Sequence, residues 1–288
     1  MNFKGFTILT LLINSFLFFS CGNEAVKTAD SNQTDSVKQN PKSVGTIKNE
    51  ATMFALPAPM QVVSILKEAN IPFSEKILIP LKQPGAITSE YHKALYLGMY
   101  SVEIGYLISY EQRQSALNYY KTIDNLLSSL YISPNLMPNT IKRFEKNVNN
   151  KDSLSAIILQ SYNNWQTYFQ SNKRENVGLY IISGSYIEGL YLSLLQADKN
   201  QSPSLKNMIG QQKVFLDNIL ELSNYMDKKP DFDDLYLKLG SIQDAYASIN
   251  VNVNDIGKGE SIVACTYTPE QIKRLLAKVT EVRNSIIK

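Results

Sequence analysis

Two apolar stretches, each with a single acidic residue near its centre, constrain the fold of this chain most strongly. Residues 91–110 read YHKALYLGMYSVEIGYLISY and carry Glu103, and residues 176–197 read NVGLYIISGSYIEGLYLSLLQA and carry Glu188. Both are long enough for a core helix. Their glycines each cost about 1 kcal/mol relative to Ala inside a helix, a cost that close helix–helix approach would offset. We therefore expect an all-α protein with both helices at its centre.

The two stretches also begin a predicted internal duplication. Aligning Glu103 with Glu188 pairs Tyr106 with Tyr191, and further along the segment IDNLL at 123–127 is echoed by LDNIL at 216–220. Matches in the same order at a long period indicate repeated helical hairpins. We predict two related layers of helical hairpins, at about 89–172 and 174–288, which form either a bundle or a short tetratricopeptide-like (TPR-like) superhelix.

The remaining pattern is helical from residue 57 onward, except in two places. Residues 73–88 contain Pro80 and Pro84 and are expected to be irregular. Between residues 251 and 267 the pattern changes: VNVN at 251–254 alternates between apolar and polar side chains, GKG at 257–259 is turn-like, and SIVACTY at 261–267 is rich in β-formers. This pattern predicts a small β-hairpin before the C-terminal helix. Helices are expected at 59–69, 89–110, 111–131, 135–148, 152–171, 176–197, 203–226, 230–249 and 269–286.

The first twenty residues indicate export. Lys4 is followed by an apolar run at 6–19 that is too short to span a bilayer as a stable anchor. Ser20 then precedes Cys21, an arrangement that resembles the lipobox of bacterial lipoproteins, in which the cysteine is lipidated and becomes the new N-terminus. The alternative is an ordinary secretory signal with a chance cysteine. We expect residues 1–20 to be a lipoprotein signal peptide and Cys21 to be the site of lipid attachment.

Residues 21–56 are rich in Asn, Gln, Ser, Thr and Lys, without a hydrophobic period. Such a composition cannot bury enough apolar surface to offset the entropy of ordering, so this segment is predicted to be a flexible tether. The single helical domain would then occupy residues 57–288. With Cys21 lipidated, Cys265 has no partner for a disulfide, and we expect it to be a small buried apolar residue.

Composition argues against several classes of function. The net charge is only +3 and no basic run occurs, whereas nucleic-acid binding needs clustered Lys and Arg. His92 is the only histidine, which leaves zinc sites, di-iron bundle sites and Ser-His or Cys-His catalysis without the ligands or bases they need. We therefore predict no catalytic residue, no metal ligand and no cofactor, and an enzyme is the less favoured class.

Glu103 and Glu188 remain the residues of interest, because a carboxylate in an apolar helix face must be paired, hydrogen-bonded or protonated. In the favoured interpretation, tyrosine hydroxyls, backbone groups or an arginine satisfy each one. Alternatively the two converge on a ligand or cation, or one or both are exposed. Arg113 would reach Glu103 only if the two helices pack antiparallel. The candidate polar core or ligand site comprises Glu103, Glu188, Tyr100, Tyr106, Tyr110, Ser185 and Tyr191.

The two interpretations of the glutamates predict opposite effects of substitution. If each carboxylate has its own donors, replacing it with Ala should cost about 1–3 kcal/mol and replacing it with Gln should cost less. If the carboxylates are held close together, they repel one another, and neutralising one of them should stabilise the fold.

Four segments of the chain carry a resemblance to a known family: YSVEIGYLISYEQRQSALNYYKTIDNLL at 100–127, KRFEKNVNNKDSLSAIILQSY at 142–162, RENVGLYIISGSYIEGLYLSL at 174–194 and TPEQIKRLLAKVTEVRNSII at 268–287. They resemble a family of uncharacterised all-helical lipoproteins of the Bacteroidota. The family has no assigned activity, so the resemblance implies an exported helical architecture and no specific function. Family members commonly carry Gly-Gly-Trp where this chain has Gly184, Ser185 and Tyr186.

These observations favour a lipid-anchored, non-enzymatic binding or scaffold protein of the cell envelope. We expect anchoring to the outer membrane, facing either the periplasm or the outside. The expected partners are the membrane, through the N-terminal lipid, and another envelope protein. The alternative is a small-ligand or metal-binding protein, including an enzyme, that uses Glu103 and Glu188.

Overall fold

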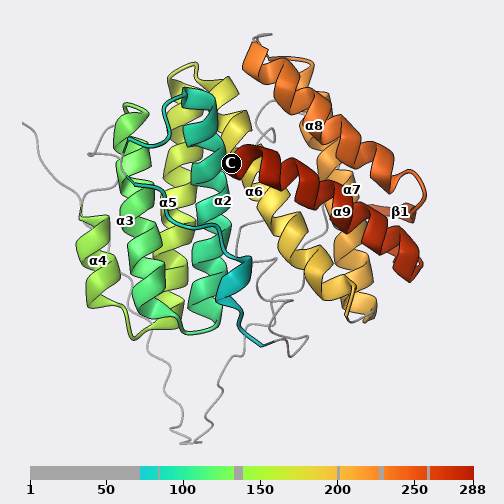
Figure 1. Ribbon diagram of the computed structural model, residues 1–288, viewed down its shortest axis with the longest axis horizontal. Helices are drawn as coiled ribbons and strands as arrows, with labels where there is room; N and C mark the ends of the chain where they lie inside the picture. The colour runs from blue at the N-terminus through green and yellow to red at the C-terminus, as the bar shows by residue number, and fades with distance from the viewer. Residues whose placement is uncertain (1–71, 84, 133–138, 200–201, 227–229, 258–259) are drawn as a thin grey trace, which may run out of the picture. The chain divides into compact units, whose positions relative to one another are not determined.

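The computed structural model describes residues 72–83, 85–132, 139–199, 202–226, 230–257 and 260–288 (Figure 1). Over these residues the protein is all-α with one antiparallel β-hairpin before the last helix, as predicted. The predicted signal peptide, tether and helix at 59–69 lie outside the described part. The elements are η2 (Glu75–Ile77), α2 (Glu90–Ser109), α3 (Arg113–Ser129), α4 (Thr140–Lys146), α5 (Lys151–Ser171), α6 (Glu175–Ala197), α7 (Pro203–Ser223), α8 (Pro230–Tyr246), β1 (Asn250–Gly257), β2 (Glu260–Thr266) and α9 (Pro269–Ile287).

Several helices begin at caps that are visible in the sequence. Ser89 caps α2 by accepting a hydrogen bond from a backbone N–H, and Ser202 caps α7 in the same way. At the start of α9, Thr268 and Gln271 form a reciprocal capping box, which satisfies two backbone donors that the helix leaves free. Helix α4 ends at Lys146, two residues before its predicted end, and the predicted start of this helix lies outside the described residues.

Helices α2 and α6 pack against each other along much of their length and run in the same direction. Tyr91 contacts Tyr180 near their N-terminal ends, and Gly98 opposes Ile181 further along. A Cβ atom on Gly98, or on Gly184, would overlap the backbone of the facing helix. Glycine is therefore required at both positions for this close approach, which confirms the expectation for these two residues.

The other helices cover the two sides of this central pair (Figure 1). Helices α3, α4 and α5 lie on the side of α2, with α5 also contacting α6. Helices α7, α8 and α9 and the hairpin lie on the side of α6. Helix α9 crosses α6, and its C-terminal end reaches α2. This crossing brings a third helix to the place where α2 and α6 carry their acidic residues.

Helix α6 is long and apolar enough to cross a membrane by length and composition, and it is the one such helix in the described part of the chain. Its most apolar window is 89% buried inside the protein. The apolar side chains of α6 are thus used in packing against neighbouring helices, as expected for a core helix.

The hairpin packs on α7 through β2. Val251 pairs with Cys265, and Val253 pairs with Val263. Gly210 of α7 leaves the space that Cys265 and Val263 occupy, because a Cβ there would lie only 2.8 Å from Cys265 Cβ. Cys265 is a buried free thiol, as predicted, and burial raises its pKa to about 11.

Candidate functional site: a buried carboxylate pair

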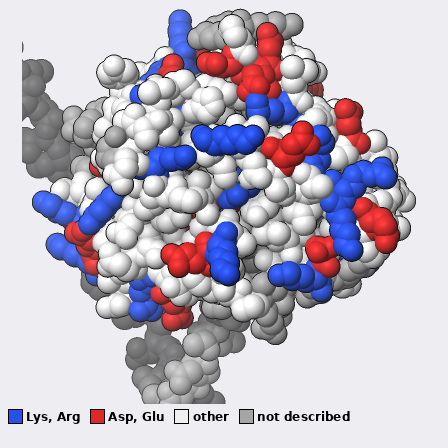
Figure 2. Space-filling model, viewed as in Figure 1, with Lys and Arg blue, Asp and Glu red and all other residues white. Residues whose placement is uncertain are grey.

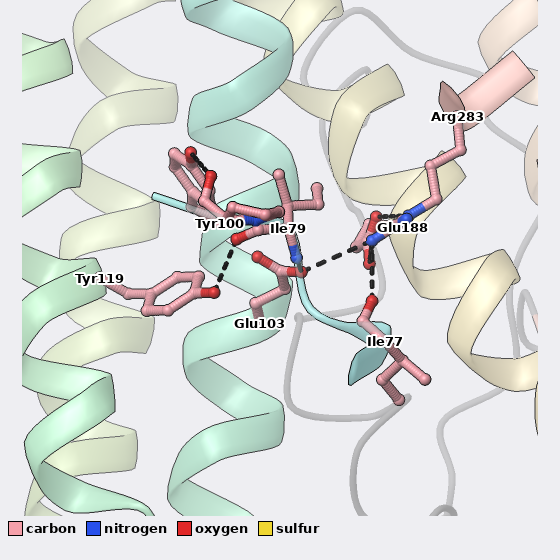
Figure 3. Close-up of polar contacts among 8 residues, drawn as sticks. Ile77, Ile79, Tyr100, Glu103, Tyr119, Glu188 and Arg283 are labelled. Carbon is pink, nitrogen blue, oxygen red and sulfur yellow. Dashed lines mark hydrogen bonds and ion pairs between the residues drawn. The ribbon is translucent and has the colours of Figure 1, made fainter. Parts of the chain in front are cut away.

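Glu103 on α2 and Glu188 on α6 come together in the core. Both side chains are completely buried, with 0% of their surface exposed. They meet because α2 and α6 run in parallel and approach closely at Gly98 and Gly184. Figure 3 shows both carboxyl groups directed toward the guanidinium group of Arg283, which enters from α9.

Arg283 forms a bidentate ion pair with Glu188. Its Nε donates to Glu188 Oε2 at 2.6 Å, and its Nη2 donates to Glu188 Oε1 at 3.0 Å. Two parallel charge-assisted hydrogen bonds of this kind are the strong form of the arginine–carboxylate contact. Arg283 Nη2 lies 3.7 Å from Glu103 Oε1, a longer contact. The guanidinium carbon also lies 4.2 Å from the centroid of the Tyr191 ring, in a cation–π contact.

Glu103 and Arg283 also bind backbone groups of residues 73–82, a segment that we call the strap. Apart from η2, the strap has no regular secondary structure and runs across α2 (Figure 1). Glu103 Oε1 accepts a hydrogen bond from the Ile79 backbone N–H at 2.6 Å. Arg283 Nη2 donates to the Ile77 carbonyl at 2.9 Å. Ile79 itself is fully buried, so the strap covers the carboxylate pair.

Two tyrosines hold the C-terminal half of the strap, at residues 79–82. Tyr119 of α3 donates its hydroxyl hydrogen to the Ile79 carbonyl at 2.7 Å. Tyr100 of α2 donates to the Pro80 carbonyl at 3.1 Å and accepts from the Lys82 N–H at 3.1 Å. These backbone groups have no partners within a helix or strand, so side chains satisfy them instead.

Tyr106 holds the N-terminal end of the strap. It accepts from the Ser74 N–H at 3.0 Å, and its ring stacks on Phe73 with centroids 5.6 Å apart. The strap is therefore bound at both ends by tyrosines of α2, with the carboxylate pair between them.

Electrostatics distinguish the two glutamates. Burial raises the pKa of Glu103 well above its ordinary value, and the nearby charge of Glu188 raises it further, although the Ile79 N–H and Arg283 oppose the shift. Burial also raises the pKa of Glu188, but Arg283 opposes this directly. Burial alone would lower the pKa of Arg283; the two carboxylates outweigh it and raise that pKa. Arg283 and Glu188 thus form the ion pair, and Glu103 is the group that favours the neutral form.

All candidate residues within the described part lie in or beside this region. Tyr191 contacts Arg283, as described above. Ser185 donates its hydroxyl hydrogen to the Gly98 carbonyl at 3.1 Å and so joins α6 to α2. Tyr110 is half-buried at the edge, with its ring centroid 4.8 Å from that of Tyr106. Cys21 lies outside the described residues, and its lipidation stays a prediction.

The sequence interpretation missed Arg283, Tyr119 and the strap. It considered Arg113 as a partner for Glu103, but Arg113 contacts Asn149 and Glu111 at the surface and does not reach the core. The signal for Arg283 was present, because it follows Val279 by four residues and so lies on the apolar stripe of α9. A single basic residue on the buried face of one helix can pair with a single acidic residue on the buried face of another helix.

The site can hold a cation between two carboxylates, and Arg283 supplies that cation. Across the described ranges, no group of three or more His, Cys, Asp and Glu side chains is placed to bind a metal ion. Comparison with protein-family models, with curated proteins and with solved structures finds no match for this chain. The resemblance to helical lipoproteins of the Bacteroidota therefore stays a prediction.

Proposed function

We propose that this protein is a lipid-anchored, non-enzymatic binding or scaffold protein of the cell envelope, attached to the outer membrane through Cys21. The observation that carries the non-enzymatic part is the contact of Arg283 with both buried carboxylates. The most conspicuous acidic groups of the chain are thereby engaged by the protein itself and closed off from solvent by the strap. Their arrangement supports a role in holding the fold together, which leaves the surface to contact partners.

The surface suits a protein partner better than a polyanion. On the face drawn in Figure 2, basic and acidic side chains are interspersed and separated by uncharged areas. A nucleic-acid partner would favour a continuous basic strip. The sequence before residue 57 supports the rest of the proposal, because a predicted export signal, a cysteine directly after it and a long polar segment together suit a domain held at a distance from a membrane.

The anchoring part is tested by Cys21→Ala in the organism's own envelope or in a bacterial host that processes lipoproteins. We expect the variant to lose incorporation of a labelled fatty acid and to leave the membrane fraction. Cys265→Ala is the matched control and should keep both properties, since Cys265 is buried in the fold. Unchanged fatty-acid labelling and membrane partition of Cys21→Ala would show the anchoring proposal to be wrong.

Orientation and partner are tested on the anchored protein. Protease added to intact cells should cleave the chain only if it faces outward. Cross-linking in intact cells, followed by mass spectrometry, should identify an envelope protein as the partner. Capture of that partner should in turn recover this chain.

A second candidate function is binding of a small cationic ligand or metal ion by Glu103 and Glu188. One observation favours it: two buried carboxylates share one guanidinium, and Glu103 Oε2 receives no hydrogen bond from the described residues. Elemental analysis of the purified protein, with Glu103→Gln as control, tests this function. A metal bound in equimolar amount to the wild type and lost in the variant would favour it over the scaffold.

A further inference from the structure

The buried cluster has an imbalance of charge. If every group were ionised, Glu103 and Glu188 would bring two negative charges and Arg283 one positive charge, with both carboxylates fully excluded from solvent. An uncompensated buried charge is costly, and a group in that position takes up a proton instead. The ion pair of Arg283 with Glu188 is bidentate, so Glu103 is the group left without full compensation.

The contacts of Glu103 compensate a negative charge only in part. Its Oε1 accepts from the Ile79 N–H at 2.6 Å, whereas no donor among the described residues reaches its buried Oε2. Arg283 Nη2 comes only within 3.7 Å of Glu103 Oε1, so the guanidinium group compensates Glu188 more closely than it compensates Glu103.

We propose that the Glu103–Glu188–Arg283 cluster is a proton-binding site, which holds one proton on Glu103 at neutral pH and thereby keeps the strap closed over α2. This goes beyond the anchored scaffold, which does not require the cluster to bind anything. The bound proton makes the cluster electrically neutral, because it leaves one carboxylate for one guanidinium.

Among the residues that the structure describes, no other group that faces Glu103 competes for this proton near neutral pH. Tyr96 and Tyr100 face it from α2, Tyr119 from α3 and Tyr191 from α6. Burial raises the pKa of every one of these tyrosines, that of Tyr96 to about 12, so all stay neutral. On α9 the facing group is Arg283, which stays charged.

The strap links protonation to conformation. Ionised Glu103 would repel Glu188, and only water or a cation could relieve that repulsion. Water reaches Glu103 when Ile79 and its neighbours lift away, since Ile79 covers the carboxyl group and hydrogen-bonds to it. Loss of the proton therefore favours an open strap, in which the backbone of residues 77–82 gives up its bonds to Arg283, Tyr119 and Tyr100.

Proton uptake during refolding tests the site directly. Denatured protein is diluted into weakly buffered solution at pH 7.5, and the protons bound are measured for wild type and for Glu103→Gln. We expect the wild type to take up about one proton more per molecule than the variant, because Glu103 is ionised in the unfolded chain and neutral in the folded one. Glu281→Gln, at an exposed position on α9, is the matched control and should behave as wild type.

Amide exchange tests the link to the strap. Protection of the Ile79 amide in the wild type should fall by about tenfold per pH unit once the pH exceeds the pKa of folded Glu103, after correction for intrinsic exchange. In Glu103→Gln the protection should not depend on pH, since the amide keeps the shape of the carboxyl group and does not titrate. Equal pH dependence in the two proteins would overturn the link.

Infrared spectroscopy of the wild type keeps the proposal testable should Glu103→Gln fail to fold. Glutamate labelled with carbon-13 should shift a protonated-carboxyl stretching band that is present at pH 7.5. Absence of such a band, or stability that rises with sodium or potassium at constant ionic strength, would overturn the proposal. A failure of the anchoring proposal would leave all of these outcomes unchanged.

Discussion

At the scale of single residues, we expect substitution of Arg283 to have a large effect on the free energy of unfolding. Replacing it with Met leaves Glu188 buried without its cation and the Ile77 carbonyl without its donor. Breaking a buried pair in this way costs about 3–5 kcal/mol. We expect Arg283→Met to lower the free energy of unfolding by about that amount, measured by urea denaturation. Lys278→Met removes a half-buried base that pairs with exposed Glu281 on the same helix, and it should change stability by no more than about 0.5 kcal/mol.

A second residue-scale prediction concerns pH. The pKa of folded Glu103 is raised above its ordinary value of 4.5, so the folded protein binds the proton more tightly than the unfolded chain does. The stability from this group is complete below about pH 4.5 and is lost as the pH rises through the folded pKa. The melting temperature of the wild type should therefore fall as the pH rises above about 4.5, and Glu103→Gln should remove most of that slope.

The two glutamine substitutions should differ in sign at pH 8. Glu103→Gln removes the need to protonate a buried carboxylate on folding and should raise the melting temperature, whereas Glu188→Gln weakens the ion pair with Arg283 and should lower it. From the sequence, a stabilising Glu→Gln substitution was expected only if the two carboxylates were held close together. A rise in melting temperature for both variants would show that Arg283 does not discriminate between the two glutamates.

At the scale of elements, the parallel contact between α2 and α6 depends on glycine. A methyl group at Gly98 would overlap the backbone of α6, which cannot move aside as a flexible side chain can. We expect Gly98→Ala to destabilise the protein by about 1–3 kcal/mol, the usual cost of overpacking. Gly240→Ala on α8 is the matched control. Nothing lies within 4 Å of its added Cβ, so it should stabilise by up to about 1 kcal/mol.

At the scale of the domain, the strap should be required for the fold of the helices. A chain that begins at residue 83 lacks the backbone groups that satisfy Glu103 and Arg283, and it exposes the core surface that Ile79 covers. We expect this chain to unfold at much lower urea concentration, or to aggregate, when compared with a chain that begins at residue 73. Equal unfolding midpoints would mean that the strap contributes nothing to stability.

Much of the fold follows from the sequence alone, because its signals are local. Ser89, Ser202 and Thr268 mark helix starts by their own chemistry, and the alternation at 251–254, the Gly-rich turn and the β-formers at 261–267 mark a hairpin whatever the hairpin packs against. Burial of Glu103 and Glu188 also follows, since the residues around each are apolar on every side of the helix. The internal duplication and the lipid anchor were likewise inferred from sequence and stay predictions.

The tertiary structure alone decided what the two glutamates contact. Arg283 lies 95 residues beyond Glu188, and the strap reaches Glu103 from 24 residues before it. The hydrophobic period of a helix shows which face is buried but not which distant helix packs on that face. Whether two buried charges meet depends on helix direction and crossing, here set by the close approach at Gly98 and Gly184. That geometry placed one cation between two acids, and it is the reason the cluster needs a proton.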